Sequence, residues 1–278
     1  MSGSTKKTGV IGWPVEGSLS PAIHNAGYAA LGLDWVYLPL PVPPGEVANA
    51  LVGLPALGFV GANVTMPHKT EVAALVGDLS EDAARLQAVN TIAVHAGALA
   101  GHNTDAPGFD RFLRFDAGFD PRGRTALLFG AGGAARACAL ALARGELATL
   151  VVAARDENQA DALRAAVDGL GTTVRTVSFD AAREVSADLV VNATPVGAAG
   201  EELPLPPLGA GATVVDLLYR PALTPLLARA KAAGAAAFGG LGLLLHQAAM
   251  SFELWTGLAP PLPVMSAAAL SKLAETSS

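Results

Sequence analysis

Short apolar runs alternate with longer alanine-rich stretches along most of the chain. The short runs have the length of buried β-strands, whereas the longer stretches have the length and composition of helices. In the first half this pattern predicts strands at 8–12, 35–40, 59–64, 91–94 and 98–100, and helices that begin near Ser20, Pro43, Pro67 and Ser80. The alternation is typical of an α/β protein, in which helices connect the strands of a mainly parallel sheet.

A second α/β unit is predicted after Arg122-Gly123, where the alternation starts again. Its predicted strands are 125–129, 150–153, 174–177, 189–193 and 213–217, its helices are 133–143 and 157–167, and two further helices follow at 241–256 and 265–274. A chain of 278 residues is long enough for two domains. We expect one domain at 1–110, to which the helices of 241–278 return, and a doubly wound domain at 111–240.

The composition narrows the class of protein. Hydrophobic residues make up 51% of the chain and charged residues 15%, which excludes a disordered protein. The charge-free stretch 232–252 is long enough for a membrane span, but its glycines, His246 and Gln247 argue against one. The N-terminus is too weakly apolar for a signal peptide, and the single cysteine, Cys138, fits a reducing compartment. We therefore expect a cytoplasmic protein, and its net charge of −6 argues against nucleic acid as a partner.

The strongest single motif is a glycine-rich turn between a predicted strand and a predicted helix. It reads Gly130-Ala131-Gly132-Gly133-Ala134-Ala135 and follows the apolar run 126–129. In such a turn the first glycine permits the tight bend, the second lets the backbone approach a pyrophosphate, and the small last residue keeps the helix close to the sheet. The helix N-terminus then offers N–H groups to the phosphates. This context predicts a Rossmann-type NAD(P)-binding domain.

The end of the next strand is where such domains distinguish the two nicotinamide cofactors. An acidic residue there binds a ribose 2′-hydroxyl, and an arginine accommodates a 2′-phosphate. Here Arg155 is followed by Asp156 and Glu157. Arg155 favours NADP because a guanidinium binds phosphate in a bidentate way. The two acids either start the next helix favourably or repel a phosphate, so NAD stays open as a second cofactor.

Polar clusters in the first half fall at the ends of predicted strands. They are Ser18-Leu19-Ser20-Pro21, Asn63-Val64-Thr65-Met66-Pro67-His68-Lys69, Ala88-Val89-Asn90-Thr91 and Gly101-His102-Asn103-Thr104-Asp105. Two hydroxyls beside a helix N-terminus suit a small carboxylate. A lysine and an aspartate that converge on one hydroxyl can move the proton lost when it is oxidised. Taken singly, each residue also has an ordinary structural explanation as a cap, a turn residue or a surface charge.

Together these clusters resemble the shikimate dehydrogenase family over nearly the whole chain. The first half carries the serine motif with His24-Asn25 and the three other clusters in the family's order. The second half adds the glycine-rich turn, Asn192-Ala193-Thr194-Pro195-Val196-Gly197, Asp216-Leu217-Leu218-Tyr219-Arg220-Pro221, and Gly240-Leu241 with Gln247. The resemblance implies reversible NADPH-linked reduction of 3-dehydroshikimate to shikimate, in the pathway to chorismate and the aromatic amino acids.

The resemblance also implies roles for particular residues. Lys69 and Asp105 would be the catalytic pair, without a decision as to which takes the proton. The substrate-binding residues would be Ser18, Ser20, Thr65, Lys69, Asn90, Asp105, Tyr219 and Gln247. The cofactor-binding residues would be Glu81, Gly130, Ala131, Gly132, Gly133, Ala134, Arg155, Thr194, Leu217 and Gly240. No metal is expected, because the nicotinamide carries the hydride and the five histidines are scattered.

The ribose-phosphate stretch departs from the family. Many members carry Asn-Arg-Thr and a further arginine there, whereas this chain has Ala154-Arg155-Asp156 and Gln159. The change removes a positive charge and adds a negative one, so we expect weaker NADP binding than in a typical member. An NAD-dependent quinate/shikimate dehydrogenase and a catalytically silent, nucleotide-sensing regulator are the alternatives. The expected partner is a small-molecule substrate, with no membrane or nucleic acid, and the expected assembly is a monomer or homodimer.

Overall fold

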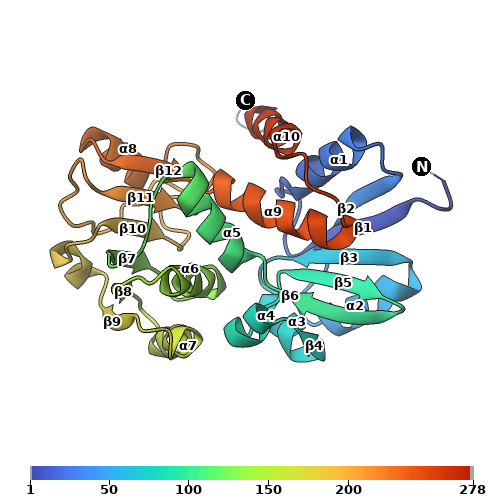
Figure 1. Ribbon diagram of the computed structural model, residues 1–278, viewed down its shortest axis with the longest axis horizontal. Helices are drawn as coiled ribbons and strands as arrows, with labels where there is room; N and C mark the ends of the chain where they lie inside the picture. The colour runs from blue at the N-terminus through green and yellow to red at the C-terminus, as the bar shows by residue number, and fades with distance from the viewer. Residues whose placement is uncertain (1, 276–278) are drawn as a thin grey trace. The chain divides into compact units, whose positions relative to one another are not determined.

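The structure is a computed structural model that describes residues 2–275 (Figure 1). The chain divides into two compact units. The first comprises Met1–Thr104 and Gln247–Ser278, and the second comprises Asp105–His246. Each unit has its own six-stranded sheet and its own hydrophobic core, and each is therefore described by itself.

The first unit is built on a mixed sheet with the strand order β2-β1-β3-β5-β6-β4. The strands are β1 (Lys6–Gly12), β2 (Trp35–Pro41), β3 (Phe59–Val64), β4 (Asp78–Leu79), β5 (Thr91–His95) and β6 (Ala98–His102). β1 is parallel to β2 and β3, whereas β5 is antiparallel to β3 and β6. The carboxyl ends of β1 and β3 therefore lie at one edge of the sheet, and the loops with the serine motif and with Thr65 begin there.

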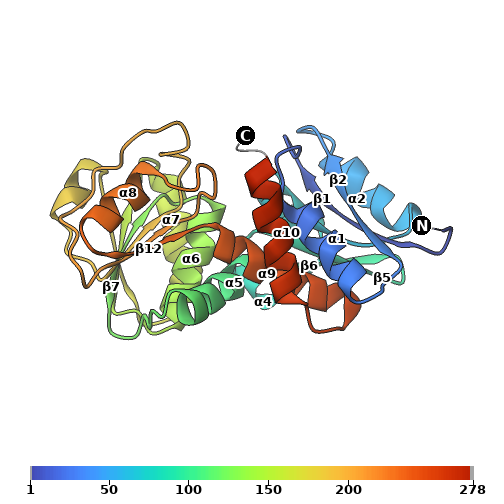
Figure 2. The same ribbon diagram turned by 90° about the horizontal axis from the view of Figure 1, so that it is seen from above.

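Helices cover both faces of this sheet (Figure 1). On one face α2 (Val47–Ala56), α3 (Lys69–Leu75) and α4 (Glu81–Leu86) share a core cluster with the strands. On the other face α1 (Ser20–Ala30) packs along α10 (Leu262–Glu275), as Figure 2 shows, and α9 (Leu241–Thr256) adds Phe252. A Cβ atom on Gly27 of α1 would lie 2.9 Å from Phe252 and 3.3 Å from Met265, so the glycine lets these helices pack closely.

The second unit has a fully parallel sheet with the strand order β12-β11-β10-β7-β8-β9. Its strands are β7 (Thr125–Phe129), β8 (Thr149–Ala153), β9 (Thr173–Val177), β10 (Leu189–Asn192), β11 (Thr213–Asp216) and β12 (Ala236–Gly239). Counted within the unit, the order is 6-5-4-1-2-3, which is the order of dinucleotide-binding domains. The strand order reverses between β7 and β10, and ligands bind at such a switch point.

Two core clusters cover the two faces of the second sheet. Leu128 and its neighbours pack with α5 (Asp105–Arg111), α6 (Gly133–Arg144) and α7 (Glu157–Val167). Leu127 packs on the opposite face with α8 (Pro225–Ala232) and the helical turn Asp180–Glu184. Successive residues of a strand point to opposite faces, so a strand that is apolar at every position is buried on both sides. The doubly wound fold expected for this half is confirmed.

Several local expectations need correction. Ser20 is not the N-cap of α1: the cap position is Leu19, no side chain caps it, and Ser20 is the first helical residue. α2 begins at Val47 and α3 at Lys69, each after a short turn, rather than near Pro43 and Pro67. The helices α5 and α8 and the short strand β4 were not expected. By contrast, Ser80 caps α4, because its side chain accepts a hydrogen bond from the Ala83 N–H.

The boundary between the units lies at residues 104/105 and 246/247, whereas the sequence suggested 110 and 241. The first turns of α9 belong to the second unit for a packing reason. A Cβ atom on Gly242 would lie 2.4 Å from the Phe112 ring, and His246 Nε2 lies 3.1 Å from Asp116 Oδ1. These contacts hold residues 241–246 against the helical turn Phe112–Asp116.

Within residues 2–275 no helix combines the length and apolarity that crossing a bilayer requires. The charge-free stretch 232–252 divides instead among the end of α8, the strand β12 and much of α9.

Candidate active site

The serine motif forms the turn between β1 and α1. The Ser20 N–H donates to Ser18 Oγ at 3.2 Å, and the Ser18 N–H donates to the Val15 carbonyl at 3.1 Å. Ser20 is only 6% exposed. The two serines therefore differ: Ser18 is half-buried at the turn, and Ser20 is held inside the unit.

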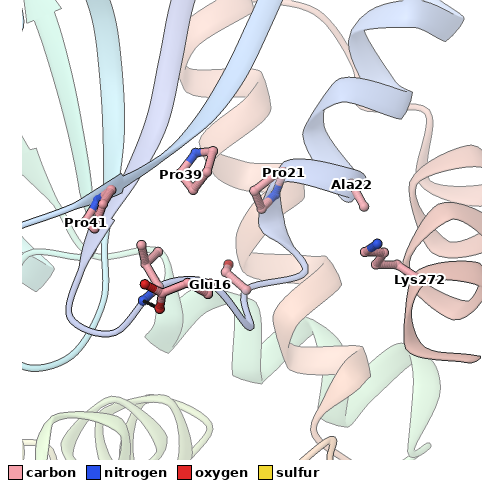
Figure 3. A pocket seen from close by; sticks show the side chains of 8 residues that line it. Glu16, Pro21, Ala22, Pro39, Pro41 and Lys272 are labelled. Atoms are coloured by element: carbon pink, nitrogen blue, oxygen red, sulfur yellow. Dashed lines mark hydrogen bonds between the residues drawn. The ribbon is translucent and has the colours of Figure 1, made fainter. Parts of the chain in front are cut away.

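A cavity of about 300 Å³ opens beside this turn (Figure 3). It is lined by Val15, Glu16, Ser18, Pro21, Ala22, Pro39, Pro41 and Lys272. Pro39 and Pro41 alternate along β2 with the same period as Tyr37, so all three point to the face that carries α1. Ser18 thus has an open, mainly apolar space on one side.

A buried set of hydrogen bonds connects the other polar clusters of the first unit; we call it the amide network, and its members are Tyr37, Asn63, Asn90, Thr91, Thr104 and Ser251. Asn63, 6% exposed, lies at its centre. Its Oδ1 accepts from the Tyr37 hydroxyl at 2.7 Å. Its Nδ2, which carries two hydrogens, lies within hydrogen-bond distance of three acceptors: the Asn90 carbonyl at 3.1 Å, Thr91 Oγ1 at 3.0 Å and Ser251 Oγ at 2.9 Å. One amide therefore joins β2, β3, β5 and α9.

Asn90 extends this network toward Asp105. Its Oδ1 accepts from the Thr104 N–H at 2.7 Å, and its Nδ2 donates to Thr104 Oγ1 at 2.9 Å. Thr104 immediately precedes Asp105, the first residue of α5. The Val89 N–H donates to the Lys69 carbonyl at 2.9 Å, so the backbone of Lys69 is joined to the residue before Asn90. Asn90 thus holds the segment that leads into Asp105, in addition to the substrate contact that the resemblance implies.

Two further predicted substrate residues are fixed in the first unit. Gln247, 8% exposed, lies one turn before Ser251, whose hydroxyl donates to the Gln247 carbonyl at 3.1 Å. Thr65 follows β3, and its N–H donates to the Ile11 carbonyl of β1 at 2.8 Å. A Cβ atom on Gly12 would lie 2.4 Å from the Thr65 methyl group, so a glycine at this position lets Thr65 pack against β1.

The glycine-rich turn of the second unit lies at the switch point of the sheet. Gly130 has φ = +100°, a conformation that favours glycine, and a Cβ atom on it would lie 3.0 Å from the Thr194 methyl group. At Gly132 and Gly133 the nearest heavy atoms to an added Cβ are 3.8 and 4.0 Å away, so the protein's own packing does not demand glycine there. These two glycines instead leave backbone open to a ligand at the N-terminus of α6, as a dinucleotide requires.

Three predicted cofactor residues are gathered by a second set of hydrogen bonds. Asn192, at the end of β10, accepts from the Thr194 N–H at 3.0 Å and hydroxyl at 2.7 Å. Its Nδ2 donates to Asp216 Oδ1 at 3.0 Å, which also accepts from the Leu218 N–H at 3.1 Å. A Cβ atom on Gly240 would lie 1.9 Å from the Leu217 carbonyl oxygen, so only glycine lets these segments meet. Thr194, Leu217 and Gly240 are thereby brought to the same edge as Gly130.

Arg155 and Asp156 follow β8 and have different roles in the structure. The Arg155 guanidinium lies 5.7 Å from the centroid of the Phe179 ring, and its side chain is exposed. Asp156 is the N-cap of α7, because its Oδ1 accepts from the Gln159 N–H at 3.3 Å. Asp156 therefore starts the helix α7, which is one of the two roles that the sequence left open for it. Arg155 is the cationic side chain that directly precedes it.

Tyr219 and Glu81 are the remaining predicted site residues. Tyr219 lies in the second unit, where burial raises the pKa of its phenol, so it stays a neutral hydrogen-bond donor. Glu81 lies in the first unit as the exposed first residue of α4, whereas the other predicted cofactor residues lie in the second unit. In the part of the chain that the structure describes, no three His, Cys, Asp or Glu side chains are grouped to hold a metal ion. Tyr37 and Ser251 were not singled out from the sequence, and Thr91 was named only as a member of the cluster that contains Asn90.

The second unit is a dinucleotide-binding domain, as its strand order, its glycine-rich turn and the loops at its switch point define. The protein is therefore a two-unit α/β protein of the nicotinamide-dependent dehydrogenase class. Residues 10–92 match the family model of the shikimate dehydrogenase substrate binding domain, and residues 240–270 match that of the shikimate 5'-dehydrogenase C-terminal domain.

Relatives cover nearly the whole chain. A shikimate dehydrogenase (NADP(+)) of Citrifermentans bemidjiense is 43% identical over 98% of this chain and 97% of its own length. The crystal structure of shikimate 5-dehydrogenase from Thermus thermophilus in complex with NADP(H) and shikimate has a TM-score of 0.86 and 38% identity, over 96% of this chain and 99% of that one. A quinate dehydrogenase from Corynebacterium glutamicum in complex with NAD has a TM-score of 0.89 and 34% identity, over 96% and 99%. The chain belongs to the shikimate dehydrogenase family.

Proposed function

We propose that this protein is an NADP-dependent shikimate dehydrogenase, which reduces 3-dehydroshikimate to shikimate and oxidises shikimate in the reverse direction. One observation carries the proposal. Within the first unit, hydrogen bonds link Asn90, the residue before Asp105 and the turn of α9 that carries Gln247. These residues come from three separate family motifs, and relatives that match nearly the whole chain are named shikimate dehydrogenase (NADP(+)).

The substrate contacts follow from the chemistry of the side chains. Ser18 and Ser20 offer hydroxyls to the substrate carboxylate at the start of α1. Thr65, Asn90, Tyr219 and Gln247 supply the neutral donors and acceptors that ring hydroxyls need. Because all of these side chains are uncharged, they can bind hydroxyl groups without the large desolvation cost of a buried charge.

The cofactor residues fit a phosphorylated dinucleotide. Gly132 and Gly133 leave the N-terminus of α6 open for the pyrophosphate, and Arg155 offers a positive charge to a 2′-phosphate. Thr194, Leu217 and Gly240 form the switch-point edge of the sheet beside this turn. When bound, NADPH supplies the hydride of the reduction.

Lys69 and Asp105 handle the proton. In the reduction they deliver a proton to the carbonyl oxygen that becomes the new hydroxyl, and in the oxidation they remove it. Two bonds of the first unit support this proposal: the backbone of Lys69 is joined to Val89, and Asn90 holds Thr104, the residue before Asp105. Efficient proton transfer requires that the transferring groups are held in position before substrate arrives.

The test is a matrix of steady-state rates with shikimate and quinate, each with NADP and with NAD. We expect the highest kcat/KM with shikimate and NADP. A higher kcat/KM with quinate and NAD would identify the protein as a quinate dehydrogenase instead. Nucleotide binding without oxidation of either acid would identify it as a nucleotide-binding regulator. We also propose that the protein is cytoplasmic and that it is either a monomer or a homodimer. Light scattering on the same preparation would distinguish these two assemblies.

A further inference from the structure

Tyr37 is held at three separate points, although neither the motifs nor the proposed chemistry assigns it a role. Its backbone is held first: Asn25 Nδ2 donates to the Tyr37 carbonyl at 2.9 Å, and the Tyr37 N–H donates to Asn25 Oδ1 at 2.8 Å. β2 lies at an edge of its sheet, so the backbone groups along its outer edge have no neighbouring strand to bond. Asn25 of α1 takes the place of that strand at this one residue.

The ring of Tyr37 is held second. The imidazole of His24 stacks on it with a centroid distance of 4.4 Å and an interplanar angle of 1°. Trp255 lies on it from α9 at a centroid distance of 6.1 Å. His24 and Asn25, adjacent in the sequence, thus hold the ring and the backbone of the same tyrosine, which explains why both residues accompany the serine motif.

The hydroxyl of Tyr37 is held third. It donates its single hydrogen to Asn63 Oδ1 at 2.7 Å. This bond shows which end of the Asn63 amide is the oxygen. The amide nitrogen faces the Asn90 carbonyl, Thr91 and Ser251. The Asn90 carbonyl can only accept, so it and the Tyr37 hydroxyl together set the orientation of the amide at the centre of the network.

We propose that Tyr37 is a positioning residue of the active site, which acts through Asn63 on the residues that meet the substrate. It touches neither substrate nor cofactor. Through Asn63 it fixes the segments that carry Asn90 and Gln247. The proposal rests on the proposed function, since these residues are assigned to the substrate through it.

The chain offers a matched control for the test. Tyr28 is also 1% exposed and also contacts the His24 ring, and its hydroxyl shares a buried hydrogen bond of 2.8 Å with Thr8. The Thr8–Tyr28 bond joins β1 to α1, and neither residue is a member of the amide network, so Tyr28→Phe removes a comparable buried hydroxyl outside that network. Tyr37→Phe and Tyr28→Phe are therefore compared for melting temperature, kcat, KM for shikimate and KM for NADP.

We expect both variants to melt at a lower temperature by similar amounts, since each loses one buried hydrogen bond. Only Tyr37→Phe should lower kcat/KM for shikimate, by about tenfold, with KM for NADP unchanged in both. If Tyr37→Phe and Tyr28→Phe keep the same kcat/KM for shikimate as the wild-type protein, Tyr37 has no positioning role. If the wild-type protein does not turn over shikimate at all, the proposed function fails, which is a different result.

A second pair of variants covers the case in which Tyr37→Phe does not fold. Ser251→Ala removes another member of the amide network, whereas Thr256→Ala removes a hydroxyl that makes the same kind of bond on the same helix, to the Phe252 carbonyl at 2.8 Å. We expect a fall in kcat/KM for shikimate in Ser251→Ala and none in Thr256→Ala. Equal values in the two variants would overturn the proposal.

Discussion

The His24 imidazole gives a stability prediction that depends on pH. The ring is fully buried among aromatic side chains, with Tyr37, Tyr28, Phe252 and Trp255 at centroid distances of 4.4 to 6.4 Å. Neither ring nitrogen has a hydrogen-bond partner in the part of the chain that the structure describes. Burial of this kind lowers the pKa of His24 from 6.5 to about 3, because the protonated ring would be a charge without a partner in an apolar site.

The sign of the effect follows from the number of protons bound in each state. Between pH 6.5 and pH 3 the unfolded chain protonates His24 and the folded protein does not. The unfolded state therefore binds more protons, and the free energy of unfolding falls as the pH falls through this window. Each pH unit below 6.5 costs about 1.4 kcal/mol, so at pH 5 the loss is about 2 kcal/mol. Above pH 7 the ring is mostly neutral in both states, so the contribution of His24 to the free energy of unfolding no longer changes with pH.

The assay compares the wild-type protein with His24→Phe, in which an aromatic ring remains on Tyr37 but cannot be protonated. Urea unfolding at pH 7 and pH 5 gives the free energy of unfolding of each protein. Other titrating groups, such as His102 and Asp216, are the same in both proteins, so they cancel in the difference between them. We expect the variant to gain about 2 kcal/mol on the wild-type protein when the pH is lowered from 7 to 5.

A parallel loss of stability in the two proteins would refute the reasoning, because His24 would then not be neutral and buried in the folded state. The difference in the free energy of unfolding between the two proteins at pH 7 does not by itself test the pKa of His24. At that pH the variant removes two buried nitrogens without partners and adds some ring volume, and these effects have opposite signs.

Two further predictions concern the chemistry. Lys69→Ala should lower kcat for shikimate oxidation by about 100-fold or more and change KM for shikimate much less, since a proton-transfer group acts mainly in the transition state; steady-state kinetics at saturating NADP checks this, and an unchanged kcat would remove Lys69 from the proton transfer. Arg155→Ala should raise KM for NADP by about tenfold and leave KM for NAD nearly unchanged, because in the proposed complex the guanidinium would meet only the 2′-phosphate. Equal changes for both cofactors would show that Arg155 does not read that phosphate.

The sequence predicts the two sheets and the glycine-rich turn well because these features are local. A strand such as 125–129 is apolar at every position after its first, and Gly130 follows it directly, so the strand, turn and helix are all specified within a short window. The helix α8 was not expected, although Thr224 caps it and Pro225 begins it. Those two helix-start signals are present in the sequence, but the charge-poor segments around them made the helix hard to predict.

The amide network could not have been predicted in the same way, because its bonds join residues far apart in the chain. Asn63 and Ser251 are 188 positions apart, and Tyr37 reads as one more aromatic residue of a strand. Asn63, Asn90, Thr91 and Thr104 stand in the polar clusters of the sequence, but nothing local links these clusters to one another. The serine in the apolar helix α9 is equally typical of an ordinary helix residue. Ser20 shows the reverse error: its local context is that of a helix cap, whereas it is the first residue of α1 and no side chain caps that helix.

Both units position their loops with a buried asparagine at the end of a strand, Asn63 in β3 and Asn192 in β10. An amide has donors and an acceptor on one side chain, so it can hold two or three segments at once, and it does so without a charge that burial would penalise. Asp216 shows the contrast: its carboxylate needs Thr224, Leu218 and Asn192 as donors, and burial still raises its pKa. Neutral amides thus allow the loops to be held rigidly while the charged groups of the proposed mechanism remain available for the reaction.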